Sequence, residues 1–435
     1  YYRLSHRNPV NRLPMNSRYL YISIFAFISI TASLAVMAIN VAIDPWSYFN
    51  TPSVAGFNLV KPDLHRYERE IEAHVLAKLR PKGLIMGASN SDVGLDPEHP
   101  GWGVGPVHNV ATGLGSITMA RRLLQHSLAF GNPEKIVLGL EYGMFDEKYQ
   151  NDGGINPASL AVTVDGERNR DYLQFNFYAN GFSLKMLNSS LKTFWLNFKQ
   201  KDAADTYRPA ITSTGMLNPD NFGNPSWKTY RDHFQSNIRY SVSSFWTPAE
   251  ELIAIENPEN EASFDRFREI LALACEKNIE LYIVLGPSHA YILVGQDALG
   301  LTGFWERWKK AVINTTSDYA QQTGCRETPV WDFSGYNELT TEVIRNERLI
   351  ENSSNWYWDP LHYRKELGDD MLNRVFGRKT NNTALQDFGV RLTTENIDAH
   401  IEQNRALAVN YRETHPEEVN LVNNTVAATL ESLEN

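Results

Sequence analysis

The chain has 435 residues, enough for one large or two medium domains, and its apolar fraction of 42% is ordinary for a globular protein. Its formal net charge of −10 argues against a nucleic acid as partner, because a phosphate backbone selects basic surfaces. The charge is asymmetric. Residues 1–18 hold four arginines and no acidic residue, so the rest of the chain carries −14 (−10 minus +4).

An uncharged segment of 25 residues, 19–43, follows these arginines. As a helix it is long enough to cross the roughly 30 Å hydrocarbon core of a bilayer. Arginines before it and acidic residues after it predict that residues 1–18 are cytoplasmic and that 44–377 lie outside the cell membrane. A cleaved signal peptide is the alternative, but its apolar stretch usually has only 7–15 residues.

The next part of the chain alternates between helical and strand patterns. A short apolar run, Leu84 to Met86, ends in Gly87-Ala88-Ser89 and is typical of a buried parallel strand. The same reading predicts helices at 62–79 and 117–130 and strands at 107–111 and 135–141. Strand, helix and strand in this order indicate a βαβ unit, so we expect a mainly parallel sheet.

The alternation stops in a polar, aromatic-rich insertion at 146–258, where the one clear amphipathic helix is predicted at 183–199. These aromatic side chains are suited either to stacking on sugar rings or to forming a small core of their own. They are Phe175, Phe177, Tyr178, Phe194, Trp195, Trp227, Tyr230, Phe245 and Trp246.

Periodicity returns after the insertion. Helices are predicted at 262–277, 304–323, 365–376 and 395–411, and strands at 280–285 and 329–333. We therefore expect a three-layer, flavodoxin-like α/β fold with about five parallel strands flanked by helices. Residues 378–435 are predicted to be a helical extension that ends in a loosely held tail. The only cysteines are Cys275 and Cys325, and the sequence leaves open whether they are bridged.

Ser89 is the first candidate for chemistry, because it follows the carboxyl end of a predicted strand. Ligands of open α/β sheets bind at that edge, and a tight turn would expose the hydroxyl. A helix starting at Asn90 or Ser91 would direct its free N–H groups at a developing negative charge. The alternative is that Ser89 or Ser91 merely caps this helix.

Asp359 and His362 are the second candidate feature. A hydroxyl becomes a good nucleophile when an imidazole removes its proton, and the imidazole needs a third group to fix its tautomer. A spacing of three residues lets one loop supply both groups. Asp359 could instead cap the following turn, with His362 packed under Trp358.

Together these motifs resemble the SGNH (GDSL-like) hydrolase superfamily. The resemblance rests on Gly87-Ala88-Ser89, on Asn109 to Gly113 after the second strand, and on Asp359-x-x-His362, and it covers 82–376 apart from the insertion. It implies that Ser89 is the nucleophile, Gly113 an oxyanion donor, His362 the general base and Asp359 its orienting partner.

With its membrane segment, the chain is also similar to the SGNH-like accessory proteins of cell-surface polysaccharide O-acetylation and teichoic acid D-alanylation. Those proteins work beside a multi-spanning membrane O-acyltransferase. The resemblance therefore implies an acyltransferase or esterase that forms an acyl-serine and acts on a glycan or a lipid-linked acyl group. We expect no cofactor, because the sequence has no metal-site motif, no phosphate loop and no dinucleotide fingerprint.

The sequence departs from the family pattern after the third strand. Many members have Gly-x-Asn-Asp there, and this asparagine completes the oxyanion hole, whereas this chain has Gly139-Leu140-Glu141-Tyr142. A carboxylate would repel an oxyanion unless it is protonated or turned away. Asn90 or Asn109 could fill the role, and His289, at another strand end, could contact substrate or act as a second base.

Two other functions therefore stay open. The departure at Glu141 and the long insertion fit an inactive SGNH-fold subunit of a membrane complex. The aromatic residues of the insertion, Trp195 and Trp227 among them, fit a glycan-binding module.

Overall fold

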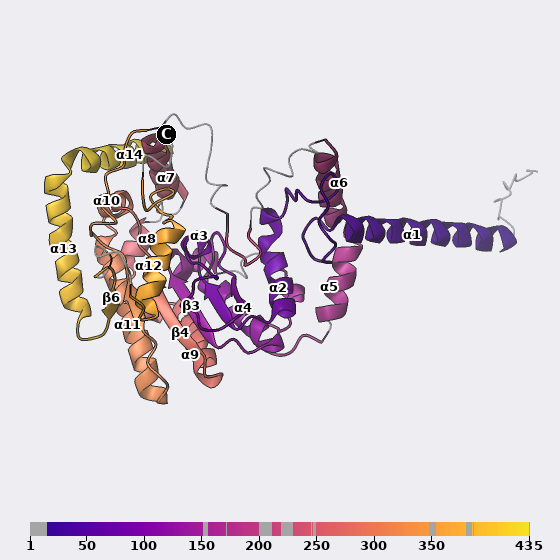
Figure 1. Ribbon diagram of the computed structural model, residues 1–435, viewed down its shortest axis with the longest axis horizontal. Helices are drawn as coiled ribbons and strands as arrows, with labels where there is room; N and C mark the ends of the chain where they lie inside the picture. The colour runs from indigo at the N-terminus through magenta and orange to yellow at the C-terminus, as the bar shows by residue number, and fades with distance from the viewer. Residues whose placement is uncertain are drawn as a thin grey trace, which may run out of the picture. The chain divides into compact units, whose positions relative to one another are not determined.

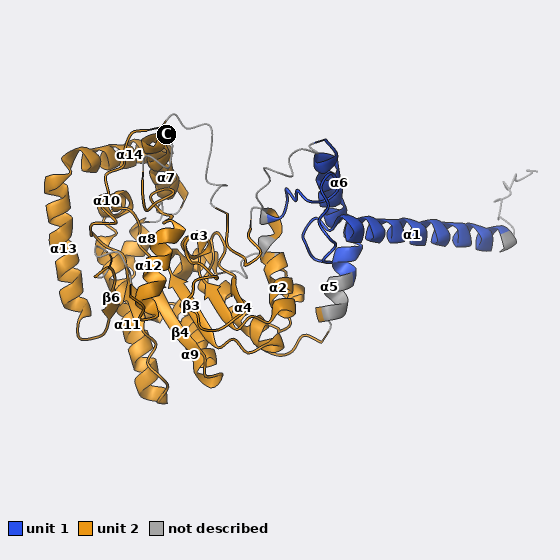
Figure 2. Cartoon of the chain, in the orientation of Figure 1, with its two compact units in different colours: residues 1–64, 173–207 blue, residues 65–172, 208–435 orange. Residues whose placement is uncertain are grey.

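The computed structural model describes residues 15–150, 155–170, 172–199, 211–218, 229–244, 246, 249–347, 354–379, 385 and 387–434. Its contacts divide the chain into two compact units (Figure 2). The first unit is the described part of 1–64 and 173–207, and the second is the described part of 65–172 and 208–435. The insertion at 146–258 therefore contributes to both units.

The first unit is built around the helix α1, Met15–Ile43, with α6, Leu184–Lys199, and nearly all of α5, Tyr172–Gly181. Within α1, residues Ser17–Ile43 are long and apolar enough to cross a membrane, and 27 residues at 1.5 Å each span about 40 Å. The end of α1 is fixed by Asp44, whose two carboxylate oxygens accept hydrogen bonds from the N–H groups of Phe49 and Thr51, both at 3.1 Å.

A six-stranded sheet forms the centre of the second unit. Its strands are β1 (Gly83–Met86), β2 (Val107–Asn109), β3 (Lys135–Leu140), β4 (Glu280–Leu285), β5 (Val330–Asp332) and β6 (Val390–Leu392), in the spatial order β2-β1-β3-β4-β5-β6. The first five strands are parallel, as predicted, with Gly83 opposite both Val107 and Lys135. The sixth strand was not predicted and runs antiparallel along β5.

Two groups of helices cover this sheet (Figure 1). One is a row in which α2 (Glu68–Leu79), α4 (Ile117–Phe130), α9 (Ala262–Glu276) and α11 (Thr302–Thr323) pack side by side. The other is α3 (Ser89–Gly94), packed against α12 (Lys365–Val375). Right-handed crossovers that run in opposite directions along a sheet place their helices on opposite faces, so the unit has three layers.

The C-terminal segment corrects the prediction of a loosely held tail. Helices α13, Ile397–Thr414, and α14, Pro416–Glu434, complete the second unit, and α14 packs against α7, Tyr230–Ser244, and α10, Ala290–Ala298. Val422 and Val426, four residues apart, bury one side of α14 while its Asn and Glu residues face outward. The remaining short helices are α8 (Ala249–Ala254) and the 3₁₀ turns His65–Tyr67, Tyr142–Phe145, Glu147–Tyr149, Pro157–Ser159 and Pro258–Asn260.

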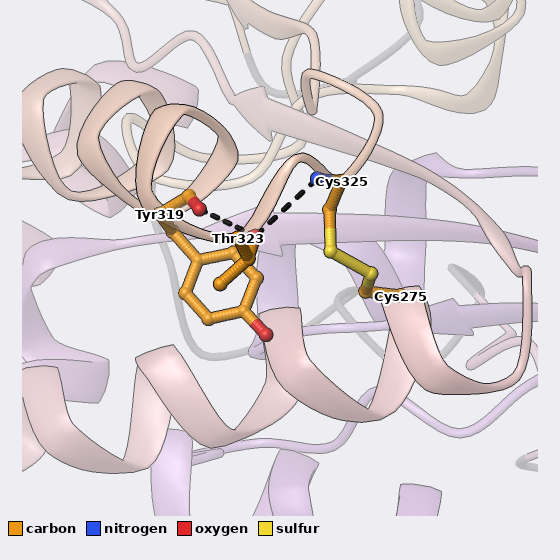
Figure 3. Close-up of a disulfide and its surroundings, with 4 residues drawn as sticks. All are labelled: Cys275, Tyr319, Thr323 and Cys325. Carbon is orange, nitrogen blue, oxygen red and sulfur yellow. Dashed lines mark hydrogen bonds between the residues drawn. A yellow bond between two sulfur atoms is a disulfide. The ribbon is translucent and has the colours of Figure 1, made fainter.

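The two cysteines form a disulfide, a point that the sequence left open (Figure 3). Cys275 lies in the last turn of α9, Cys325 follows the end of α11, and their Cα atoms are 5.9 Å apart. Thr323 supports the second cysteine, because its hydroxyl accepts a hydrogen bond from the Cys325 N–H and donates one to the Tyr319 carbonyl. The bridge therefore joins two helices that are neighbours in one layer.

Candidate functional site

Ser89 lies directly after β1, on the tight turn that the sequence predicts. Gly87 adopts a φ of +153°, and a Cβ there would lie 2.5 Å from the Ser91 Oγ and 2.8 Å from the Gly139 carbonyl, so only glycine fits. Because β2 and β3 lie on opposite sides of β1, the order in which the chain adds strands to the sheet reverses at β1, and a crevice opens beyond such a point. Ser89 is therefore at the position where this class of sheet binds ligands.

The structure brings three predicted residues into one hydrogen-bonded relay. The Ser89 Oγ lies 2.8 Å from the Nε2 of His362, and the Nδ1 of His362 lies 2.7 Å from the Oδ2 of Asp359. With Asp359 accepting from Nδ1–H, the imidazole exposes the basic Nε2 to the serine hydroxyl. The chain can therefore move a proton from Ser89 to His362.

Asp359 also caps its own turn, so it makes the contacts that both interpretations of this residue require. Its Oδ1 accepts hydrogen bonds from the N–H groups of Leu361, at 2.8 Å, and His362, at 3.0 Å, while its Oδ2 faces the imidazole. The loop is closed by the Trp358 N–H, which donates to the His362 carbonyl at 2.8 Å. The acid and the base are thus held by one rigid turn.

Electrostatics favour the relay. Burial lowers the pKa of His362, but the Asp359 carboxylate and the charge of Glu141 raise it, and the net pKa lies above its ordinary value. Burial raises the pKa of Asp359, but the imidazole and backbone N–H groups lower it, and the net pKa lies below its ordinary value. At neutral pH Asp359 is therefore ionised and His362 is a strengthened base.

Glu141 lies beside this relay and lines the same cavity as Ser89 and Gly113. Burial raises the pKa of Glu141, while the nearby His362 and hydrogen bonds from the backbone and side-chain amide of Asn90 lower it, leaving the net pKa raised. Asn90 is thus engaged with Glu141. Within the described residues, no hydrogen bond is found from the backbone N–H of Ser89 or of Gly113, so both groups are available as hydrogen-bond donors.

Two predicted site residues have structural roles instead. Asn109 is fully buried, its amide donates to the carbonyls of Ser91 and Leu95, and its Oδ1 accepts from the Ala111 N–H. It fixes the backbone behind α3 and does not reach the cavity. The prediction that Asn109 contacts an oxyanion or a substrate is therefore wrong.

His289 is also corrected. It is fully buried, its Nδ1 accepts from the Tyr291 N–H, and its Nε2 donates to the Glu342 carbonyl at 2.8 Å. Burial lowers the pKa of His289 to about 4, so the ring is neutral. Its backbone N–H donates to the Pro360 carbonyl at 2.9 Å. His289 thus anchors the loop that carries Asp359 and cannot contact substrate.

Other residues, which the sequence does not mark as functional, also hold this loop. Glu342 accepts hydrogen bonds from the Ser354 hydroxyl and from the N–H of Trp356, and the Tyr230 hydroxyl donates to the Tyr357 carbonyl at 2.6 Å. Tyr230 is separated from Tyr357 by 127 positions, and the sequence around Tyr230 resembles that around any buried aromatic residue. No sequence signal distinguishes such an anchor.

One large cavity, of about 720 Å³, opens onto Ser89 and His362 and lies entirely within the second unit. Its wall is mainly apolar. Apolar side chains in the wall include Trp246, Trp305, Trp308, Leu285, Ile292 and Ala408. Trp195 lies outside this cavity, on α6 of the first unit, and Trp227 and Phe245 lie outside the described residues.

Charged side chains in the cavity wall are largely paired with one another. The Nζ of Lys309 lies 2.7 Å from the Oδ2 of the buried Asp332 and 2.6 Å from the Ser334 Oγ. Arg405 binds Glu306 through two of its nitrogens. These pairs reduce the net charge that a ligand meets, so the cavity favours an uncharged, largely apolar group.

No protein-family model matches the chain, and no curated protein sequence matches it. The α/β sheet and the Ser89–His362–Asp359 relay therefore carry the functional argument on their own.

Proposed function

We propose that this chain is a membrane-anchored, SGNH-type serine acyltransferase or esterase that works through an acyl-Ser89 intermediate. The observation that carries the proposal is the continuous relay from Ser89 through His362 to Asp359, which opens into an apolar cavity. A cap or a packing role needs no such alignment of three side chains from two distant segments.

The proposed reaction has two half-steps. The Ser89 Oγ attacks the acyl carbonyl carbon while the Nε2 of His362 takes the hydroxyl proton, and the N–H groups of Ser89 and Gly113 face the oxyanion. The tetrahedral intermediate then expels the alcohol, which receives that proton from His362. In the second half-step, water or an acceptor hydroxyl gives its proton to His362 and attacks the acyl-Ser89. Collapse breaks the bond to the Ser89 Oγ, which recovers the proton from His362, and releases an acid or a new ester.

The cavity favours a substrate with an extended apolar acyl part. A volume of 720 Å³ is equal to roughly two dozen water-sized groups at about 30 Å³ each, far more than an acetyl group fills. Burying apolar surface contributes about 0.8 kcal/mol per methylene, so a longer chain should bind more tightly. A lipid-linked acyl donor fits this cavity better than a free acetyl ester.

Two features support a location outside a cell membrane. The apolar α1 follows an arginine-rich segment, which favours a cytoplasmic N-terminus. The chain contains the Cys275–Cys325 disulfide, and disulfides persist in oxidising compartments but are rare in the cytosol. Both agree with an anchored enzyme outside the membrane. We propose, from the resemblance to the SGNH-like accessory proteins, that it acts on a cell-surface glycan or lipid beside an integral membrane acyltransferase.

A second candidate function is an inactive accessory subunit that keeps this fold. It is favoured by Glu141, whose raised pKa does not remove the cost of a carboxyl group beside a forming oxyanion.

Ester hydrolysis separates the two candidates. We expect the full-length protein in detergent to hydrolyse p-nitrophenyl octanoate faster than the acetate, and Ser89→Ala to lower kcat/KM by at least about 10³-fold. Ser91→Ala is the matched control, because Ser91 lies in the same short helix but packs beneath Gly87. Equal rates for Ser89→Ala and the unmodified protein would favour the accessory subunit.

A further inference from the structure

Helix α6 of the first unit buries mainly polar side chains and exposes large apolar ones. The five side chains on its buried stripe are Met186, Ser189, Ser190, Thr193 and Asn197, and all except Met186 are polar. Its exposed side carries large apolar side chains: Leu184, Leu191, Phe194, Trp195 and Phe198. In water, a surface helix has the opposite arrangement.

Specific hydrogen bonds fix this orientation. The Ser190 hydroxyl donates to the Asn40 Oδ1 at 3.0 Å, and the Ser189 hydroxyl donates to the Asp63 Oδ2 at 2.6 Å. The side-chain amide of Asn197 both accepts from and donates to the backbone of Val60, at 2.9 and 2.8 Å. Turning α6 to hide its apolar side would leave these buried polar groups without their hydrogen-bond partners, which opposes that rotation.

The same contacts tie α6 to the end of the apolar helix α1. Asn40 lies in the last turn of α1, and its Nδ2 donates to the carbonyls of Gly181 and Ser183, both at 3.0 Å. Figure 2 shows that α6 runs across this end of α1. A helix fixed across the end of a membrane span lies at the boundary between hydrocarbon and water.

Three lysines of α6, at seven-residue intervals, lie next to its apolar side: Lys185, Lys192 and Lys199. Lys192 lies 3.5 Å from the Oδ2 of Asp63, and the ammonium of Lys199 lies 4.9 Å from the centre of the Trp195 ring. Lys185 lies over the Trp46 ring at 5.6 Å. Long lysine side chains can place apolar stems beside lipid chains and ammonium groups beside phosphates, and Trp is enriched at the same depth.

We propose that α6 is an interfacial helix whose apolar side enters the outer boundary of a bilayer and whose lysines meet anionic lipid headgroups. This inference rests on the proposed membrane span of α1. It assigns a second membrane contact, so that the first unit is held by a span and by a helix lying in the membrane plane, with a fixed orientation relative to the surface.

The test uses the full-length protein in vesicles of phosphatidylcholine and phosphatidylglycerol, with lipids that carry a quencher either near the headgroup or deep in the acyl chains. Single cysteines labelled with an environment-sensitive fluorophore replace Leu191, Phe198, Phe27 or Ala406. The native cysteines are bridged and do not react with the label under non-reducing conditions. Phe27, in α1, tests the span, and Ala406, on the exposed side of α13, is the matched control.

We expect quenching at Leu191 and Phe198, quenching by deeper quenchers at Phe27, and none at Ala406. Quenching at Phe27 without quenching at the two α6 positions would overturn the inference and leave the anchor intact. Absence of quenching at Phe27 would contradict the anchor itself, and the inference with it.

A second measurement needs no substitution. The unmodified protein in vesicles with photoreactive acyl chains should acquire lipid adducts on the peptide 184–199 as well as on α1. Adducts on α1 alone would overturn the inference, because α6 would then not touch lipid.

Discussion

Helices α9 and α6 are both amphipathic, yet they bury opposite kinds of side chain. In α9 the buried stripe is mainly apolar, with Phe264, Phe267, Ile270 and Leu271, and the charged residues face outward. In α6 hydroxyl and amide groups face inward, and Trp195 is 56% exposed. An amphipathic pattern therefore identifies two sides of a helix, and the surroundings decide which side is buried.

The proposed chemistry and the proposed membrane attachment involve different units, so we expect that each can be disrupted without the other. The largest effect is expected for Asp359→Asn. Without the carboxylate, His362 loses its orientation and the stabilisation of its cation, so kcat/KM should fall by about 10²–10⁴-fold. Vesicle binding of the same variant, measured by flotation, should stay unchanged. A loss of binding would contradict the independence of activity and membrane attachment.

The pH profile gives Asp359→Asn a signature that misfolding would not produce. His362 must be neutral to act as a base, so activity rises as the pH passes its pKa, which lies above 6.5 in the intact relay. Removing the negative charge of Asp359 lowers this pKa. The acid limb of kcat/KM should therefore move to lower pH. A limb that stays in place would argue against His362 as the base.

Helices α9 and α6 can be compared by replacing one phenylalanine with alanine on each. Phe267→Ala on α9 removes a fully buried ring and should destabilise the second unit by about 3–5 kcal/mol. Phe198→Ala on α6 removes a half-exposed ring and should change the stability of the detergent-solubilised protein by no more than about 0.5 kcal/mol. Chemical denaturation of both variants measures the difference, and equal losses would contradict the inverted packing of α6.

A smaller effect is expected at the bridge between α9 and α11. Cys275→Ser opens a loop closed across 50 positions and should cost about 2–4 kcal/mol. Reduction of the unmodified protein should give the same loss in denaturation experiments, whereas the reductant should leave the variant unaffected. A reductant effect on Cys275→Ser would mean that the loss has another origin.

The smallest effect is expected for Glu141→Gln, in the wall of the cavity that contains Ser89. Glu141→Gln removes the negative charge that raises the pKa of His362, so the acid limb should move to lower pH. Because a carboxylate next to an oxyanion opposes the reaction, kcat should rise by up to about tenfold. Steady-state kinetics with a soluble ester measures both. A fall in kcat would contradict this reading and assign Glu141 a proton or hydrogen bond that an amide cannot replace.

Much of the second unit could be predicted from local patterns. The apolar run before Gly87 gives β1 and the position of Ser89, and the spacing of Asp359 and His362 suits one loop. The predicted helix 117–130 and strand 280–285 have the observed bounds. Such elements bury one side against a single core, so periodicity is sufficient to find them.

Other features depend on partners that are distant in sequence. His289 follows a strand end just as Ser89 does, but it is covered by its contacts with Glu342 and Pro360. The disulfide forms because α9 and α11 are neighbours in the fold. The C-terminal helix α14 is held in place because Val422 and Val426 are buried and α14 packs against α7 and α10. A single sequence does not show which distant surfaces meet.

The most direct test of the central claim is mass spectrometry of the full-length protein after treatment with a long-chain fluorophosphonate. This probe modifies a serine only when a neighbouring base activates it. We predict a single adduct that maps to Ser89 and is absent from Ser89→Ala and from His362→Ala. An unmodified Ser89 in protein whose fold is intact by circular dichroism would contradict the claim that His362 and Asp359 activate it.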